Sequence, residues 1–149
     1  AMTNPKQAAE FVERTGCDSL AIAVGSVHAM RQRQAELDQG RICACAAAVD
    51  VPLVLHGSSG VTHESVRRAI ENGIAKVNVG TYLAQGFTDV TRSEATAKPN
   101  EYDPRKILSV AREEVKRRVR EKIRLFGSSG KSDLGRGEQL PTLGFAAIE

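Results

Sequence analysis

The sequence predicts an α/β fold with a parallel sheet, and three observations support this prediction. Short apolar runs over 19–24, 52–55 and 75–79 are typical of strands buried on both faces. Segments with apolar residues at helical spacing precede, separate and follow these runs. Each gap is long enough for a crossover helix. Repeated βα units of this kind form either an open doubly wound sheet or part of a (β/α)8 TIM barrel.

The first expected helix begins at Thr3-Asn4-Pro5, a capping residue followed by a proline suited to the first helical position, and it ends at Gly16. The strand over 19–24 ends at Gly25-Ser26-Val27-His28. The Ala-rich run over 42–49 predicts the next helix. It is followed by an expected strand over 52–55, a loop over 57–60 and a helix over 62–72 capped by Thr62. A strand over 75–79 and a helix over 82–92 complete the repeat.

A linker over 98–102 leads to a long basic helix over 103–126, begun by Asp103-Pro104. Its apolar stripe is expected to consist of Ile107, Val110, Ala111, Val115, Val119 and Ile123. Residues 105–131 carry ten Lys or Arg and three Glu, which exceeds the net charge of +3 for the whole chain. A solvated helix face explains this charge, and attraction to a phosphorylated ligand or acidic partner is the alternative. We expect one domain over 1–126 and a flexible tail over 127–149.

The composition excludes several classes of protein. Of the 149 residues, 41% are hydrophobic and 26% charged, and no apolar run approaches the ~18 residues of a membrane span. The start lacks a secretory pattern, and three cysteines without framework spacing favour reduced thiols, so we expect a cytoplasmic protein. Aromatic residues make up 4%, which argues against base-stacking surfaces. We therefore expect neither a nucleic-acid nor a membrane partner.

Two histidines follow two successive strands. His28 and His56 each end a strand, and neighbouring strands lie ~4.8 Å apart, so both imidazoles can converge on one metal ion. A catalytic zinc site uses three protein ligands. The remaining histidine, His63, lies at a helix start and is interpreted as a surface residue. The alternative for each histidine is an ordinary hydrogen-bonded role.

Two glycine-containing segments also follow strands. Gly57-Ser58-Ser59-Gly60 precedes one helix, and Asn78-Val79-Gly80-Thr81 precedes the next. Small residues let the backbone approach an anion, and a helix N-terminus directs N–H groups toward it. Two such segments in consecutive units predict a phosphate site, to which Ser59, Thr81 and Asn78 add side-chain donors.

Two other chemistries are disfavoured. The serine pair lacks the G-x-S-x-G spacing of a hydrolase nucleophile. Cys43 and Cys45 lie on an expected helix, where their side chains would diverge by ~200°, so they are interpreted as structural residues rather than metal ligands.

Taken together, these motifs resemble the C-terminal half of a class II, zinc-dependent ketose-bisphosphate aldolase of the fructose- and tagatose-bisphosphate group. The matching stretches, which span about residues 4–131, are AAEFVERTGCDSLAIAVGSVH, VPLVLHGSSG, AIENGIAKVNVGT and EYDPRKIL…KIRLFGSSGK. The resemblance implies a (β/α)8 barrel of which this chain is about the last three βα units plus a long C-terminal helix. It also implies a homo-oligomer.

The resemblance implies roles for particular residues. His28 and His56 match two of three zinc ligands. Gly57, Ser58 and Ser59 match the loop that binds the phosphate of dihydroxyacetone phosphate, and Asn78, Val79, Gly80 and Thr81 match the second phosphate-binding segment. One Zn²⁺, acting as a Lewis acid, would support reversible aldol cleavage of a ketose 1,6-bisphosphate.

The sequence also departs from the family pattern. The third zinc histidine and the catalytic Asp of the family belong to its N-terminal half, so no catalytic acid/base is expected in this chain. Ala29 stands where a glycine usually follows the first histidine. Gly80 and Ala84 replace an Asp and an Arg of fructose-bisphosphate enzymes, which favours a tagatose-type or other sugar phosphate.

Two alternative hypotheses for the function follow from these observations. The first is the zinc- and phosphate-binding half of an aldolase, inactive alone and completed by an N-terminal half or a partner chain. The second is a non-catalytic sugar-phosphate-binding or assembly subunit derived from the same fold.

Overall fold

The computed structural model describes residues 2–26 and 35–132, and its centre is a three-stranded parallel sheet. The strands are β1 (Leu20–Ile22), β2 (Leu53–Leu55) and β3 (Ile74–Val77), in the spatial order β1-β2-β3. Leu20 pairs with Leu53, and Leu53 pairs with Ile74, with one register irregularity after Leu53. The expected parallel sheet is therefore confirmed, although β1 is shorter than the run over 19–24.

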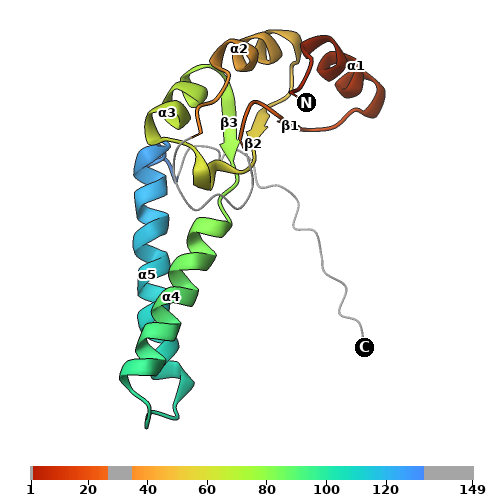
Figure 1. The fold of residues 1–149 in the computed structure, drawn as a ribbon. Coiled ribbons are helices and arrows are strands. Elements are labelled where there is room, and N and C mark those ends of the chain that lie inside the picture. Colours follow the sequence, from red (N-terminus) through yellow and green to blue (C-terminus); the bar gives the residue numbers. More distant parts are fainter. Residues whose placement is uncertain (1, 27–34, 133–149) are drawn as a thin grey trace, which may run out of the picture.

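Three helices lie in a row on one side of the sheet, as Figure 1 shows, and the first of them packs against the second. They are α1 (Pro5–Thr15), α2 (Gln39–Ala48) and α3 (His63–Glu71). Each begins at a capping side chain: those of Asn4, Asp38 and Thr62 accept hydrogen bonds from backbone N–H groups of the first turn. An open doubly wound sheet carries helices on both faces. On the opposite face, among the described residues, Ala21 and Lys76 are exposed and Val54 of the central strand is buried. The placement of α1, α2 and α3 on one side agrees with a barrel segment.

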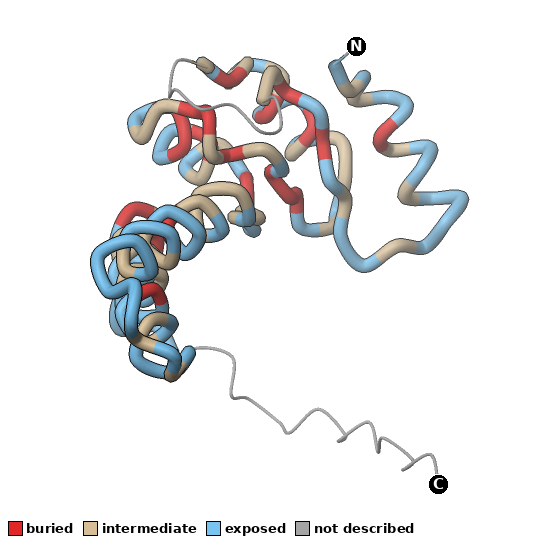
Figure 2. The backbone as a smooth tube through the Cα atoms, turned by 60° about the horizontal axis from the view of Figure 1, so that its bottom comes forward, coloured by how far each residue is buried: buried red, intermediate tan, exposed pale blue. Residues whose placement is uncertain are grey.

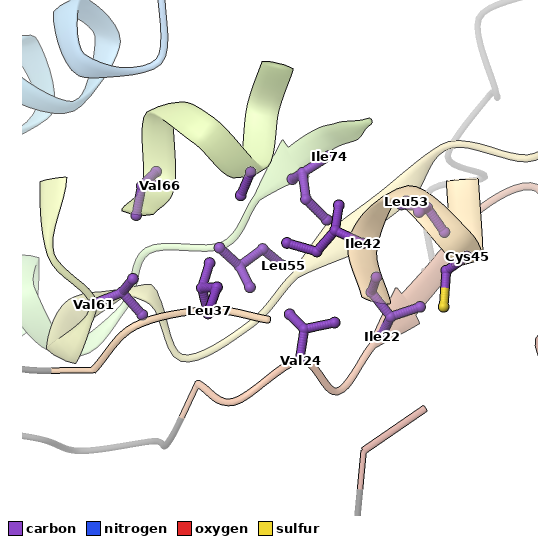
Figure 3. Packing of buried hydrophobic residues seen from close by; sticks show 11 residues of the cluster. Ile22, Val24, Leu37, Ile42, Cys45, Leu53, Leu55, Val61, Val66 and Ile74 are labelled. Carbon is purple, nitrogen blue, oxygen red and sulfur yellow. The ribbon is translucent and has the colours of Figure 1, made fainter. Parts of the chain in front are cut away.

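The hydrophobic core lies between the sheet and helices α2 and α3 (Figure 3). Leu55 of the central strand and Ile42 of α2 are fully buried, and Val66 of α3 closes the core at one end. Burial of each such side chain contributes about 1.5–3 kcal/mol, which is why short strands suffice here. The core thus fixes the carboxyl ends of β2 and β3 against two capped helices.

A helical hairpin extends away from the sheet (Figure 1). It consists of α4 (Thr81–Ala97) and α5 (Pro104–Leu125), which pack side by side and are largely exposed (Figure 2). Helix α4 continues beyond the expected end at residue 92. The additional turn carries a salt bridge from Lys98 to Glu94, 2.6 Å long.

The apolar stripe expected on α5 is partly wrong. Ala111 is buried, but Val110, Val119 and Ile123 are each more than a third exposed. The helix instead turns Ala111, Lys122 and Leu125 inward. The reason is that α5 packs mainly against one partner, α4, through a face that includes the long stems of basic side chains.

Other expectations lie partly outside the described residues. Residues 127–132 follow α5 in turns, whereas 133–149, most of the expected tail, are outside. No helix in the part of the chain that the structure describes is long and apolar enough to span a membrane.

Candidate functional site

One cavity of about 420 Å³ opens at the carboxyl ends of β2 and β3. The pairing of Leu55 with Val77 sets the two strand ends side by side. The segments that follow these strands therefore meet around the same space. The lining residues are His56, Gly57, Ser58, Ser59, Val77, Asn78, Val79, Gly80 and Thr81. The structure thus brings together His56 and all seven candidate substrate-binding residues, and it adds Val77, which the sequence assigned only to a strand.

Only one of the two candidate metal ligands lies within the described residues. His56 lies on the cavity, at the end of β2, and is exposed. His28 and its neighbour Ala29 lie outside the described residues. Within residues 2–26 and 35–132, no three His, Cys, Asp or Glu side chains are grouped as a metal site would require.

Asn78 contacts the imidazole of His56. Its Nδ2 atom lies 3.2 Å from Nε2 of His56, so in this arrangement the amide donates and the ring nitrogen accepts. With a metal on Nδ1, Nε2 would carry the proton and donate it to the amide oxygen of Asn78 after rotation of that side chain. Histidines that bind metals commonly use their second ring nitrogen in a hydrogen bond that orients the ring. An imidazole at a strand end, oriented by a neighbouring amide, is a donor of the type that zinc accepts. The described residues therefore fit one ligand of a zinc site.

The hydroxyl groups of the two serines in the first loop have different hydrogen-bond roles. Ser58 is 3% exposed, and its hydroxyl donates a 3.1 Å hydrogen bond to the backbone carbonyl of Asn78. This bond ties the two loops together and uses the Ser58 proton. The Ser59 hydroxyl instead accepts from the backbone N–H of Tyr82, at 3.3 Å. Because a hydroxyl both accepts and donates, Ser59 retains a proton for a ligand.

Backbone conformation shapes both loops. Gly57 has φ of 67°, in the left-handed region that favours glycine, and it turns the chain from β2 into the short 3₁₀ turn η1 (Ser58–Gly60). Gly80 is the N-cap of α4 and provides no capping side chain. Gly80 and Thr81 line the cavity, so the partial positive charge at the start of this 17-residue helix lies beside it. The arrangement can accept an anion beside a metal ligand.

His63 lies away from this cavity, at the start of α3. Its Nε2 atom is 3.7 Å from Oε1 of Glu121 on α5. The side chain is 39% exposed, which agrees with its interpretation as a surface residue.

Tyr82 was missed by the sequence analysis. The residue follows Thr81, and its backbone N–H reaches Ser59 in the first loop. A possible signal was Gly86, an otherwise unfavourable residue in the middle of the same helix.

Comparisons with known proteins show the family and agree with the fold. The family model described as class-II fructose-bisphosphate aldolase matches residues 1–131. The X-ray structure of the YdjI aldolase from Escherichia coli K12 superposes with a TM-score of 0.74 at 42% identity, covering 87% of this chain and 46% of that chain. A putative fructose-1,6-bisphosphate aldolase from Coccidioides immitis gives a TM-score of 0.79 at 31% identity, covering 89% and 46%.

A more distant structure supports the fold alone. Fructose-bisphosphate aldolase (Fba) from Campylobacter jejuni superposes with a TM-score of 0.70 at 22% identity, covering 85% of this chain and 45% of that chain. The chain thus spans less than half the length of these three solved structures.

Proposed function

This chain belongs to the class II fructose-bisphosphate aldolase family, and on that premise we propose that it forms the phosphate-binding part of a zinc-dependent aldolase. The reaction is the reversible aldol cleavage of a ketose 1,6-bisphosphate to dihydroxyacetone phosphate and an aldehyde phosphate. The observation that carries the proposal is the single cavity lined by both glycine-containing loops and by His56.

The phosphate of dihydroxyacetone phosphate is assigned to the space between Gly57–Ser59 and the first turn of α4. Gly80 has open space where a Cβ would lie, so an anion can approach the backbone there. Ser59 and Thr81 supply hydroxyl donors beside the same backbone. Ser58 contributes indirectly, since its hydroxyl holds the Asn78 segment in place.

The metal ligands from this chain are His28 and His56, and the third ligand comes from outside it. A zinc ion held there would supply Lewis-acid chemistry that polarises the ketone oxygen of the substrate. Asn78 contacts the His56 ring and lines the same cavity, so it is assigned to orient the ring and to face the substrate. No residue of this chain is assigned as the acid/base that handles protons of the aldehyde-derived oxygen.

The substrate is proposed to differ from strict fructose 1,6-bisphosphate. Gly80 and Ala84 carry no charged groups that could meet the second half of that sugar. A tagatose-type or related ketose bisphosphate is therefore favoured.

Completion of the barrel requires more chain than is present here. Three strands in the order β1-β2-β3 leave two ends of the sheet for pairing, whereas a closed barrel has no edges. We infer that an N-terminal half, in the same chain or in a partner, supplies the other strands, the third zinc ligand and the acid/base. The assembled protein is expected to be a homo-oligomer.

The proposal is tested by measuring binding and cleavage separately. Residues 1–149 with added Zn²⁺ are expected to give no retro-aldol cleavage, because a zinc ligand and the acid/base are absent. Robust cleavage that EDTA abolishes would show that this part is complete by itself.

The protein supplied with both halves is expected to bind dihydroxyacetone phosphate in calorimetry and to cleave a ketose bisphosphate. A double substitution of Ser59→Ala and Thr81→Val should weaken that binding, with Glu113→Gln on the exposed side of α5 as the control. Binding without any cleavage by the complete protein would instead identify a non-catalytic sugar-phosphate-binding subunit.

A further inference from the structure

Tyr82 joins the rim of the cavity to the long helix α5. It follows Gly80 and Thr81, which line the cavity, in the first turn of α4. Its backbone N–H donates to the hydroxyl of Ser59, at 3.3 Å. Its backbone carbonyl accepts a 2.6 Å hydrogen bond from Nη1 of Arg118 on α5. Both backbone groups of one residue are therefore fixed, one by the first loop and one by α5.

The side chain of Tyr82 is held by α5 as well. The guanidinium carbon of Arg118 lies 4.5 Å from the ring centroid, and Nζ of Lys122 lies 4.8 Å from it. Cations over an aromatic face at these distances are attracted to it. The phenol hydroxyl donates a 2.7 Å hydrogen bond to Oε2 of Glu121. Two consecutive turns of α5 thus hold the start of α4.

Arg118 can reach Tyr82 because α4 has a glycine where the guanidinium crosses it. A Cβ added to Gly86 would lie 2.6 Å from Cζ and 2.7 Å from Cδ of Arg118, so any side chain there would require Arg118 to leave its present position. Glycine is among the poorest helix formers, and this contact provides a physical reason for its position. On its other side, Nε of Arg118 donates to Oε1 of Glu114, at 2.7 Å. The Arg118 side chain is only 18% exposed.

We propose that Arg118 is a positioning residue for the phosphate site, which it serves by holding the first turn of α4 against the Gly57–Gly60 loop. The inference rests on the proposed phosphate binding in this cavity. The N–H groups of a helix bind an anion only where they point at it, and a shift of about 1 Å in such a site can cost ~100-fold in function. Helix α5 lies side by side with α4 (Figure 1) and contributes no lining residue to the cavity, so its effect is transmitted through Tyr82.

The first test compares two arginines of α5. Arg118 contacts both the backbone carbonyl and the ring of Tyr82, whereas Arg112 is 76% exposed and lies 3.9 Å from Glu113 in a surface salt bridge. Inorganic phosphate is titrated calorimetrically into the zinc-loaded protein supplied with both halves and into its variants. Arg118→Met is expected to raise the dissociation constant about tenfold or more. Arg112→Met, the exposed control, should stay within about twofold of the unsubstituted protein.

A second variant keeps Arg118 but fills the space that its side chain occupies beside α4. Gly86→Ala favours helix formation by itself, yet its methyl group occupies the position of the guanidinium. It is expected to weaken phosphate binding while the helical content measured by circular dichroism stays the same or rises. Zinc affinity, measured by competition with a chromophoric chelator, should remain unchanged in both variants, because His56 is held by β2 and Asn78. A general loss of structure would lower the affinity for both ligands.

The outcomes separate this inference from the proposed function. If the unsubstituted protein binds phosphate and both Arg118→Met and Gly86→Ala bind it equally well, the positioning role is wrong and the phosphate site stands. Equal loss of phosphate and zinc affinity would likewise overturn it in favour of a structural role. If the unsubstituted protein does not bind phosphate, the proposed function fails and this inference fails with it.

Discussion

The side-chain amide of Asn78, directly after β3, lies 3.2 Å from Nε2 of His56, directly after β2. The contact joins a candidate metal ligand to a candidate substrate-binding residue. It depends on the neighbouring register of the two strands, in which Leu55 pairs with Val77. The two residues therefore act as one unit, and removal of the amide should lower the affinity for zinc more than the stability of the fold.

Asn78→Ala is expected to lower zinc affinity by about 10- to 100-fold, the range typical for loss of a partner that orients a metal-binding histidine. The affinity is measured by competition with a chromophoric chelator. Ser59→Ala is the matched control, because Ser59 lines the same cavity but its hydroxyl accepts from the backbone N–H of Tyr82. Unchanged zinc affinity in Asn78→Ala would show that the imidazole is positioned by other groups.

The two serines of the loop should separate stability from ligand binding. Ser58→Ala removes a buried hydrogen bond to the carbonyl of Asn78 and should cost about 1–3 kcal/mol in the free energy of unfolding. Ser59→Ala should change this free energy less and weaken phosphate binding more. Urea denaturation and calorimetric titration of both variants provide the comparison. The reverse order of effects would contradict the roles assigned to the two hydroxyls.

The elements that depend on local sequence were predicted well. Asn4-Pro5 and Gly16 bound α1, and Thr62 begins α3, because capping acts within one turn of the chain. The convergence of the two loops on one cavity could also be anticipated, since parallel strands present their carboxyl ends at one edge.

The features that depend on packing could not be predicted in the same way. Apolar periodicity on α5 includes Val119 and Ile123, yet the face that meets α4 carries Arg118 and Lys122. The periodicity cannot tell which face a neighbouring helix will cover, nor that Gly86 admits a guanidinium. The role of Tyr82 results from this tertiary contact and has no local pattern.

Two cysteines on α2 should differ in reactivity. Cys45 is fully buried in the core, and this burial raises the pKa of its thiol, whereas Cys43, two residues earlier, is exposed. The thiolate is the reactive form, so both access and pKa protect Cys45. In the native protein, iodoacetamide is expected to label Cys43 well before Cys45, as read by peptide mass spectrometry. Cys43→Ser should remove the early label from the α2 peptide, and early labelling of Cys45 would show that α2 opens locally.

The hairpin should weaken in acid because of Glu114. Hydrogen bonds from Arg117 and Arg118 lower the pKa of this carboxyl from 4.5 to about 2. A carboxyl whose pKa is lower in the folded state stabilises the protein above its unfolded pKa, and that stabilisation is lost as the pH falls toward the folded value. The part of the stability due to Glu114 should therefore be intact above about pH 4.5 and decline toward pH 2.

Urea denaturation between pH 2 and pH 6 measures this decline. Glu114→Gln should flatten the pH dependence in that window, because the glutamine does not titrate. Glu113→Gln is the matched control, since Glu113 is the exposed neighbour on the same helix and its side chain is 58% exposed. Equal flattening by both substitutions would mean that general charge on α5, rather than the bridge from Glu114 to the two arginines, determines acid stability. Because Arg118 also holds Tyr82, phosphate affinity of the Glu114→Gln variant should fall as well, and an unchanged affinity would show that Tyr82 alone keeps Arg118 in place.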